Sequence, residues 1–239
     1  DIAVTDWGKD EVTLLMNDGG VLVRGDVLAA GADPASVIAA DFDSDFDNDI
    51  ALVNVTSNTL RILLNDGSGS FLETVELQTA EEPRALCAAR LDSDDLLDLV
   101  VANRGSNSIS VFFGRGDGTF FLGQSYYAGP GSQSLQACDV DGDRSMDLIV
   151  ANPGISGEGT VRVFINDGEG GFRSSHDMTI SGGVRMIETI DFDGDGDMDL
   201  LAVREMSYGT LAVYLNDGGG YFSPGPPVYL DNWPTWVEV

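Results

Sequence analysis

Aspartate occupies every second position in two short segments of the chain, residues 41–49 and 191–199. The carboxylates are Asp41, Asp43, Asp45, Asp47 and Asp49 in the first segment, and Asp191, Asp193, Asp195, Asp197 and Asp199 in the second. Like charges at this spacing repel one another, but oxygen ligands at alternate positions of a tight loop converge on a hard cation. Ca²⁺ takes 6 to 8 oxygen ligands. The two segments therefore predict calcium-binding loops.

Two further segments carry the same pattern with substitutions. Residues 139–147 keep Asp139, Asp141, Asp143 and Asp147 and have Ser145 at position 7, where such loops typically contribute a main-chain carbonyl. Residues 90–98 keep Asp92, Asp94 and Asp98 but have Arg90 at position 1 and Leu96 at position 7. Arg90 removes a carboxylate and adds a cation close to the metal position, so an internal salt bridge is the alternative to an ion in this loop. We predict three Ca²⁺ sites and a weaker fourth.

Other metal motifs do not fit these segments. An EF-hand requires glutamate at position 12 and flanking helices, whereas position 12 is apolar in all four copies: Leu52, Val101, Val150 and Ala202. One histidine and two separated cysteines do not make a zinc site. The remaining alternative is that the aspartates form solvated turns without an ion.

The four acidic segments belong to a repeat of about 50 residues, because they begin at residues 41, 90, 139 and 191. A glycine-rich turn keeps the same phase, starting at Asn17, Asn65, Gly114, Asn166 and Asn216. Repeats of 40 to 50 residues are typical of propeller blades. Two motifs that remain in phase over the whole chain make a chance match improbable.

Each repeat contains four short runs rich in aliphatic, aromatic and β-branched residues, as in residues 184–190, 200–204, 210–217 and 221–230. Runs of this length bounded by Gly, Asn and Asp predict β-strands. The expected fold is all-β, a single β-propeller of four-stranded antiparallel blades over residues 1–239. The predicted repeats are residues 1–35 with 235–239, 36–83, 84–133, 134–182 and 183–234. They form either a five-blade ring closed by the C-terminal strand or a segment of a larger propeller.

Composition narrows the possible partners. With 43% hydrophobic residues, the chain can bury a substantial core despite its net charge of −28. This charge argues against a nucleic-acid partner. No apolar run approaches the ~20 residues that a membrane-spanning helix needs.

The combination "DFDGDGDMDL…NDGGGYF" resembles the FG-GAP/VCBS repeat of integrin α-subunit propellers and bacterial surface proteins, and the resemblance extends over essentially the whole chain. It implies a structural calcium loop between the first and second strands of each blade, on the face away from the usual ligand surface. It also implies seven blades, and a glycine at position 6 that this chain keeps only as Gly196. The other three loops have Phe46, Asp95 and Arg144 there.

These features predict a calcium-stabilised binding, adhesion or scaffold module that is extracellular, on the cell surface or periplasmic, and not catalytic. Its partner would be a protein or a glycan, bound by loops at the opposite face, and Trp7 is the candidate contact. These loops are residues 5–11, 54–59, 103–108, 152–159 and 204–209. One alternative is the propeller domain of a polysaccharide lyase or hydrolase, although His176 is the only histidine and has no evident nucleophile partner. The other is a purely structural segment of a larger surface protein.

Overall fold

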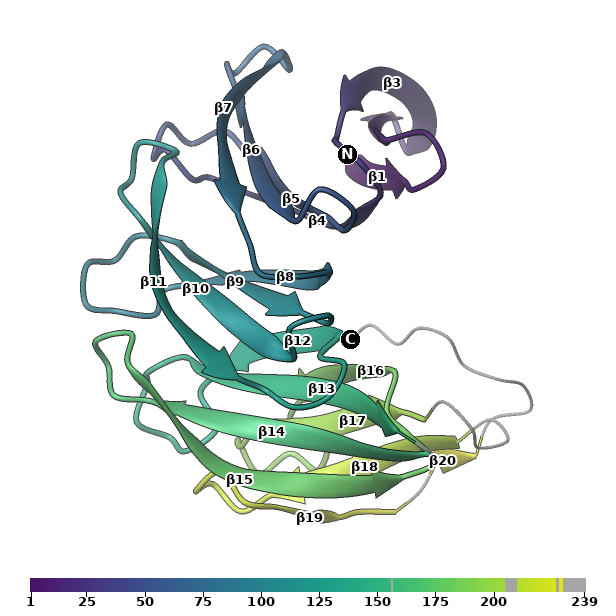
Figure 1. Cartoon of the computed structure of the whole chain (residues 1–239), viewed down its shortest axis with the longest axis vertical. Helices are drawn as coiled ribbons and strands as arrows, with labels where there is room; N and C mark the ends of the chain where they lie inside the picture. The colour runs from purple at the N-terminus through teal and green to yellow at the C-terminus, as the bar shows by residue number, and fades with distance from the viewer. Residues whose placement is uncertain (156, 205–209, 227, 230–239) are drawn as a thin grey trace. The chain divides into compact units, whose positions relative to one another are not determined.

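The computed structural model describes residues 1–155, 157–204, 210–226 and 228–229. Its described elements are all β-strands, arranged in five sheets (Figure 1). The first sheet contains β1 (Ile2–Asp6), β2 (Glu11–Asp18) and β3 (Val21–Ala29). The second contains β4 (Pro34–Ala40), β5 (Asp49–Asn54), β6 (Thr59–Asn65) and β7 (Phe71–Gln78). The third contains β8 (Pro83–Ala89), β9 (Asp98–Asn103), β10 (Ser108–Gly114) and β11 (Phe120–Tyr127).

The fourth sheet contains β12 (Ser134–Cys138), β13 (Asp147–Ile155), β14 (Glu158–Asn166) and β15 (Phe172–Ser181). The fifth contains β16 (Met186–Ile190), β17 (Asp199–Val203), β18 (Thr210–Asn216), β19 (Phe222–Pro224) and β20 (Val228–Tyr229). Strands follow one another in chain order within each sheet, and β20 additionally pairs with β18. The predicted all-β architecture of repeated antiparallel sheets is confirmed. Residues 235–239, predicted to complete the first blade, lie outside the described residues.

Burial explains why the strand sequences do not alternate cleanly between apolar and polar residues. All residues of β5, β9 and β17, each the strand that follows an acidic loop, are buried. A strand covered on both faces reads as a continuous apolar run. This is the environment of the inner strands of stacked propeller blades. The first residue of each of these strands is position 9 of the preceding acidic loop, so position 9 lies inside the protein.

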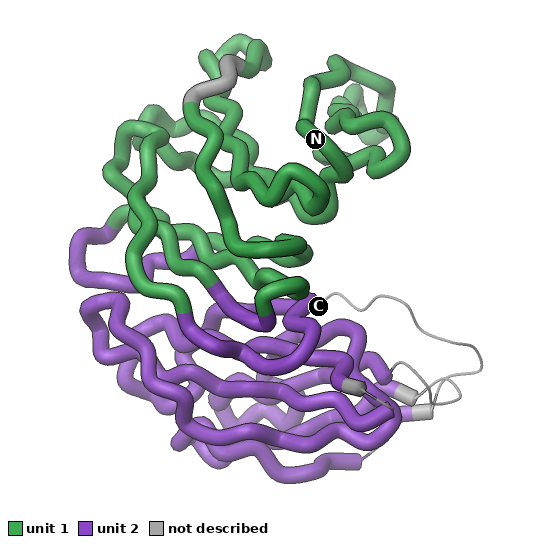
Figure 2. Tube along the Cα trace, viewed as in Figure 1, with its two compact units in different colours: residues 1–88, 96–106, 110–125 green, residues 89–95, 107–109, 126–239 purple. Residues whose placement is uncertain are grey.

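The chain divides into two compact units, shown in Figure 2. The first comprises residues 1–88, 96–106 and 110–125, and the second comprises residues 89–95, 107–109 and 126–239. In the first unit, one apolar cluster contains the edge-to-face pair Phe42 and Phe120, with ring centroids 5.7 Å apart. In the second unit, the core includes Val140, Ile149, Val163 and Leu200. Among the described residues, no helix is long and apolar enough to cross a membrane.

Candidate metal centre

Each complete acidic loop connects the first strand of a sheet to the second. Residues 41–49 run from the end of β4 to the first residue of β5, and residues 139–147 and 191–199 do the same in the fourth and fifth sheets. Position 9 is therefore also the first residue of a buried strand. This arrangement fixes one end of each loop to the sheet and leaves its middle exposed.

The aspartate at position 9 holds the loop against the third strand. Asp147 is fully buried, and its two carboxylate oxygens accept backbone N–H groups of Val140 at 3.0 Å and Asn166 at 2.8 Å. The equivalent pairs are Phe42 and Asn65 on Asp49, and Phe192 and Asn216 on Asp199. A buried carboxylate needs such donors, because an unsatisfied charge in the interior is strongly unfavourable. The aspartate therefore connects the loop to the end of the third strand in each sheet.

The aspartate at position 1 organises the middle of the loop. Asp139 accepts N–H groups from Gly142 at 2.8 Å and Arg144 at 2.9 Å, one with each oxygen. Asp191 does the same with Gly194 and Gly196, and Asp41 accepts from Asp45 and Phe46. These hydrogen bonds fold each loop back over its own first residue, so that the carboxylates that follow in the loop converge.

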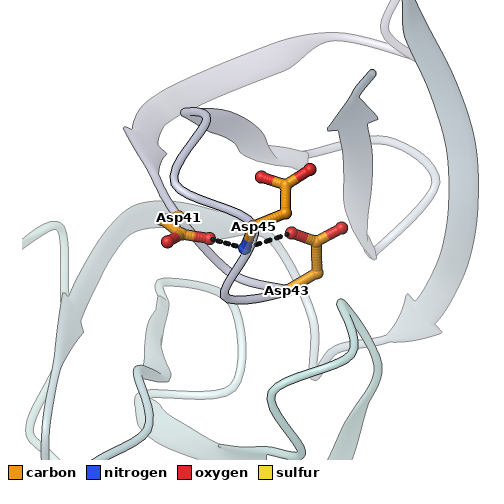
Figure 3. Close-up of side chains that lie close together, drawn as sticks. All are labelled: Asp41, Asp43 and Asp45. Atoms are coloured by element: carbon orange, nitrogen blue, oxygen red, sulfur yellow. Dashed lines mark hydrogen bonds between the residues drawn. The ribbon is translucent and has the colours of Figure 1, made fainter. Parts of the chain in front are cut away.

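Three groups of carboxylates meet closely enough to hold one ion each: Asp41 with Asp43 and Asp45, Asp139 with Asp141 and Asp147, and Asp191 with Asp193 and Asp199. Within each group, one oxygen per residue lies within 4.8 Å of the others. In Figure 3, the side chains of Asp41 and Asp43 both approach the backbone nitrogen of Asp45, at 3.2 and 3.3 Å. Because Ca–O distances are about 2.3–2.6 Å, two ligands of one ion can be about 5 Å apart. The all-oxygen donor sets fit Ca²⁺.

The electrostatics of these groups favour a cation. Burial, with smaller contributions from the charges of Asp141 and Asp143, raises the pKa of Asp147 to about 6. Burial, followed by neighbouring carboxylates, also raises the pKa of Asp43 and of Asp193. The carboxylates therefore repel one another at neutral pH, and a divalent ion between them would convert this repulsion into attraction.

The position-7 side chain faces the glycine-rich turn and lies outside the three carboxylate groups. A Cβ atom added to Gly67 would lie 2.5 Å from Oδ2 of Asp47, and one on Gly218 would lie 2.6 Å from Oδ2 of Asp197. Ser145 and Leu96 occupy the same place beside Gly168 and Gly116. All four glycines also have positive φ, between 69° and 81°. The two sequence motifs are therefore in contact, which explains why they remain in phase.

The asparagine that opens the glycine-rich turn has a larger role than the sequence indicated. Asn216 donates its side-chain N–H to the carbonyl of Val140 at 2.8 Å and to that of Met198 at 3.2 Å. Asn166 makes the same bonds, to Leu91 at 2.8 Å and Met146 at 3.0 Å. Each asparagine thus joins its own acidic loop to the preceding one. Gly114 replaces the asparagine in the third sheet, and there Gly118 donates its backbone N–H to the Phe42 carbonyl at 3.1 Å. Asn166 and Asn216 recur one repeat apart in the sequence, which is a signal for this role, although their residue type alone predicts only a turn.

Position 6 adopts the left-handed conformation whether or not it is glycine. The φ angles are 74° at Phe46, 65° at Asp95, 77° at Arg144 and 99° at Gly196. The departures from the family glycine therefore leave the sharp turn in place. They cost strain, because a side chain at such φ values is unfavourable by roughly 1–2 kcal/mol.

The second loop differs from the other three. Asp98 is fully buried and accepts the N–H of Gly114 at 2.9 Å, so its position-9 contact to the third strand is preserved. Asp92 accepts the N–H of Asp94 at 3.1 Å. Within the described part of the chain, however, Asp92, Asp94 and Asp98 form no group comparable to the other three. Arg90 donates from Nε to the carbonyl of Asp95 at 2.8 Å, a hydrogen bond to the main chain, whereas the alternative to an ion in this loop was an internal salt bridge.

The loops at the opposite ends of the strands are less dissimilar than their sequences suggest. Asp10, Asn58 and Asn107 all have φ between 55° and 58°. The carbonyl of Asn107 accepts the N–H of Ala128 at 2.9 Å, and its side chain accepts that of Gly131 at 2.8 Å. Asp10 and Asn58 make the equivalent bonds. One residue in each of these loops thus fixes the connection to the next sheet.

Trp7 lies in the hairpin between β1 and β2 and is 56% exposed. The Arg84 guanidinium carbon lies 5.3 Å from its ring centroid. His176, in contrast, belongs to a packing cluster. Its ring stacks on Tyr221 with centroids 5.0 Å apart and an interplanar angle of 14°, and burial lowers its pKa.

Comparison with solved structures supports the propeller fold. A protein from Lactobacillus plantarum has a TM-score of 0.67 at 16% identity, over 92% of this chain and 65% of its own. Proposed 6-phosphogluconolactonases from Bacteroides fragilis and Bacteroides uniformis both have a TM-score of 0.73 at 14% identity. These alignments cover 98% and 99% of this chain and 70% and 72% of the relatives. The chain thus spans about two thirds of the length of these proteins, and the likeness establishes the fold alone.

A search of curated protein sequences found no match to the chain. The FG-GAP-like repeat, in contrast, matches three consecutive and overlapping segments, residues 90–150, 139–202 and 191–239. Each match begins at position 1 of an acidic loop, and together they cover more than half of the sequence. The chain is a β-propeller protein that belongs to the FG-GAP-like repeat family.

Proposed function

We propose that this chain is a non-catalytic, calcium-stabilised β-propeller module that acts in binding, adhesion or scaffolding outside the cytoplasm. The observation that carries the proposal is the convergence of three carboxylate groups in loops that are each hydrogen-bonded to the end of the third strand. Residues arranged in this way hold an ion whose effect extends into the sheet. The second loop keeps the buried aspartate at position 9 but has no comparable group of carboxylates, so the group, and not the buried aspartate, distinguishes the three proposed sites.

The bound ion would act on stability. It would offset the repulsion between carboxylates and fix the loop that connects the first and second strands. At a Ca²⁺ concentration 100 times the dissociation constant, each site adds about 2.7 kcal/mol to the free energy of unfolding. Extracellular calcium modules have dissociation constants of roughly 10⁻⁴ to 10⁻³ M. Sites of that affinity would be filled only where calcium is abundant, which is the reason for placing the protein outside the cytoplasm.

The partner surface would lie at the opposite ends of the strands, where Asp10, Asn58 and Asn107 fix the backbone and leave neighbouring side chains available. Trp7 is the candidate contact, because its exposed ring can stack on a sugar or pack against an apolar side chain. The proposed partner is a protein or a glycan. Replacing Trp7 with alanine should reduce binding to such a partner without changing the melting temperature in calcium.

The test is thermal unfolding after removal of calcium with a chelator, followed by titration with Ca²⁺ or Mg²⁺. We expect the melting temperature to rise with Ca²⁺ and much less with Mg²⁺, which prefers octahedral sites that keep several waters. Asp43→Asn and Asp193→Asn should each reduce the rise, whereas Asp92→Asn, the matched position-3 change in the second loop, should leave it intact. A melting temperature that is the same in chelator and in calcium would refute the proposal.

A further inference from the structure

Position 1 of the acidic loops makes one of two opposite contacts with position 6. In three loops an aspartate accepts the backbone N–H of position 6: Phe46 on Asp41 at 3.1 Å, Arg144 on Asp139 at 2.9 Å and Gly196 on Asp191 at 3.2 Å. In the second loop Arg90 is the donor, from Nε to the position-6 carbonyl of Asp95 at 2.8 Å. The polarity of the contact is therefore reversed, although both arrangements close the loop between the same two positions.

The backbone of the second loop also differs at position 4. Ser44, Gly142 and Gly194 occupy this position in the other loops, with φ of 66°, 79° and 82°. Ser93 is not among the described residues with positive φ. Because Ser44 has the same side chain and adopts the left-handed conformation, residue type does not explain the difference. The two loops do differ at position 1, since Asp41 accepts the N–H groups of Asp45 and Phe46, whereas arginine has no acceptor.

The surroundings of the second loop remain acidic. Asp92, Asp94 and Asp95 lie in the loop itself. Ser93 lies 3.4 Å from a carboxylate oxygen of Glu169. A cation is therefore favourable here as in the other loops, and Arg90 brings a permanent one into the loop.

We propose that the Arg90 guanidinium is a built-in cation that takes the place of calcium in the second loop, so this loop keeps its shape at any calcium concentration. The inference rests on the proposed calcium sites of the other three loops. Among the four acidic loops, it makes the loop of the third sheet the one that does not depend on calcium. Loss of calcium would loosen the loops at residues 41–49, 139–147 and 191–199 but not the one at residues 90–98.

The first test uses hydrogen exchange of the unmodified protein in chelator and in saturating Ca²⁺. We expect calcium to slow exchange of backbone amides in three loops by at least tenfold and to leave residues 90–98 unchanged. Slowing at residues 90–98 as well would overturn the inference while supporting the calcium sites. If no loop responded, the proposed function would fail and the inference with it.

The second test asks whether Arg90 alone excludes the ion. Arg90→Asp restores aspartate at positions 1, 3 and 5, the arrangement found at Asp41, Asp43 and Asp45, and should raise the calcium stoichiometry by calorimetry from three to four. Arg90→Gln is the matched control, because it removes the charge without adding a carboxylate, and should leave three. Four ions in the unmodified protein would overturn the inference, and so would an unchanged count of three in a folded Arg90→Asp variant.

Discussion

Mild acidification should stabilise the calcium-free protein, and Asp147 should account for a measurable share of the effect. Burial raises the pKa of Asp147 to about 6 in the folded state, against an ordinary value of 3.8 in the unfolded chain. The folded state therefore binds more protons than the unfolded state between these two values. By linkage, the free energy of unfolding must rise as the pH falls through 6 and level off below 3.8.

The size of the effect follows from these two values. Between pH 7 and pH 5, protonation of Asp147 should add about 1.3 kcal/mol to the free energy of unfolding. Asp43, Asp49 and Asp193 also have raised pKa values and act in the same direction. His176 opposes them, because its pKa is lowered and the unfolded state gains the proton first. Carboxyl groups whose pKa is lowered, such as that of Asp177, change the free energy of unfolding only below about pH 4, so they do not contribute between pH 7 and pH 5.

The assay is urea unfolding of protein freed of calcium, at pH 7, 6 and 5, for the unmodified chain and for Asp147→Asn. Asparagine cannot titrate, so the difference in the free energy of unfolding between the two proteins should change by about 1.3 kcal/mol over this range. In saturating Ca²⁺ the pH dependence should reverse, because protons then compete with the ion for the same carboxylates. A difference between the two calcium-free proteins that does not change from pH 7 to pH 5 would refute the assigned pKa and its cause.

Three further changes test other parts of the site by urea unfolding. Phe46→Gly should stabilise the protein by about 1 kcal/mol, because it relieves the strain of a left-handed backbone conformation and the side chain it removes is 95% exposed. Destabilisation would show that the backbone at this residue is not strained. Gly218→Ala should destabilise the protein more than Gly194→Ala. Both glycines have positive φ, but only a Cβ atom added at residue 218 would meet Asp197, at 2.6 Å. Equal losses of stability would show that this contact is unimportant. Asn166→Ala should cost about 2–4 kcal/mol even in chelator, because it removes a buried hydrogen bond to the Leu91 carbonyl and a partly buried one to the Met146 carbonyl. A loss seen only in calcium would assign the residue to the ion instead.

The features that can be predicted from the sequence are those whose residue types recur at the same positions in each repeat. Alternating aspartates require a loop that brings oxygens together, and flanking apolar runs require strands, so the fold class and the positions of the acidic loops could be predicted. The effect of Arg90 could be predicted in part, because charge alone disfavours an ion there. Its hydrogen bond to the Asp95 carbonyl could not, since the choice between a carboxylate and a carbonyl partner depends on the backbone of the loop.

Contacts between repeats were harder to predict. Asn166 and Asn216 have the composition of turn residues, and nothing in their spacing indicates which carbonyl their side chains reach. The same is true of Asp10, Asn58 and Asn107, which share a positive φ and the same two acceptor contacts, although only the segments of Asn58 and Asn107 are similar in sequence. Such contacts depend on how far one sheet lies from the next, which is a property of packed strands and not of a local pattern.

These contacts determine how far the effect of an ion can spread in the second unit. An ion held by Asp139, Asp141 and Asp147 would order residues 139–147, including Val140, whose N–H is bonded to Asp147 and whose carbonyl is bonded to Asn216. Asn216 in turn donates its backbone N–H to Asp199, a member of the next carboxylate group. The path from one group to the next is therefore a continuous series of buried hydrogen bonds. Calcium binding at the two groups should then be cooperative, because each ion orders a donor or an acceptor that the other loop uses.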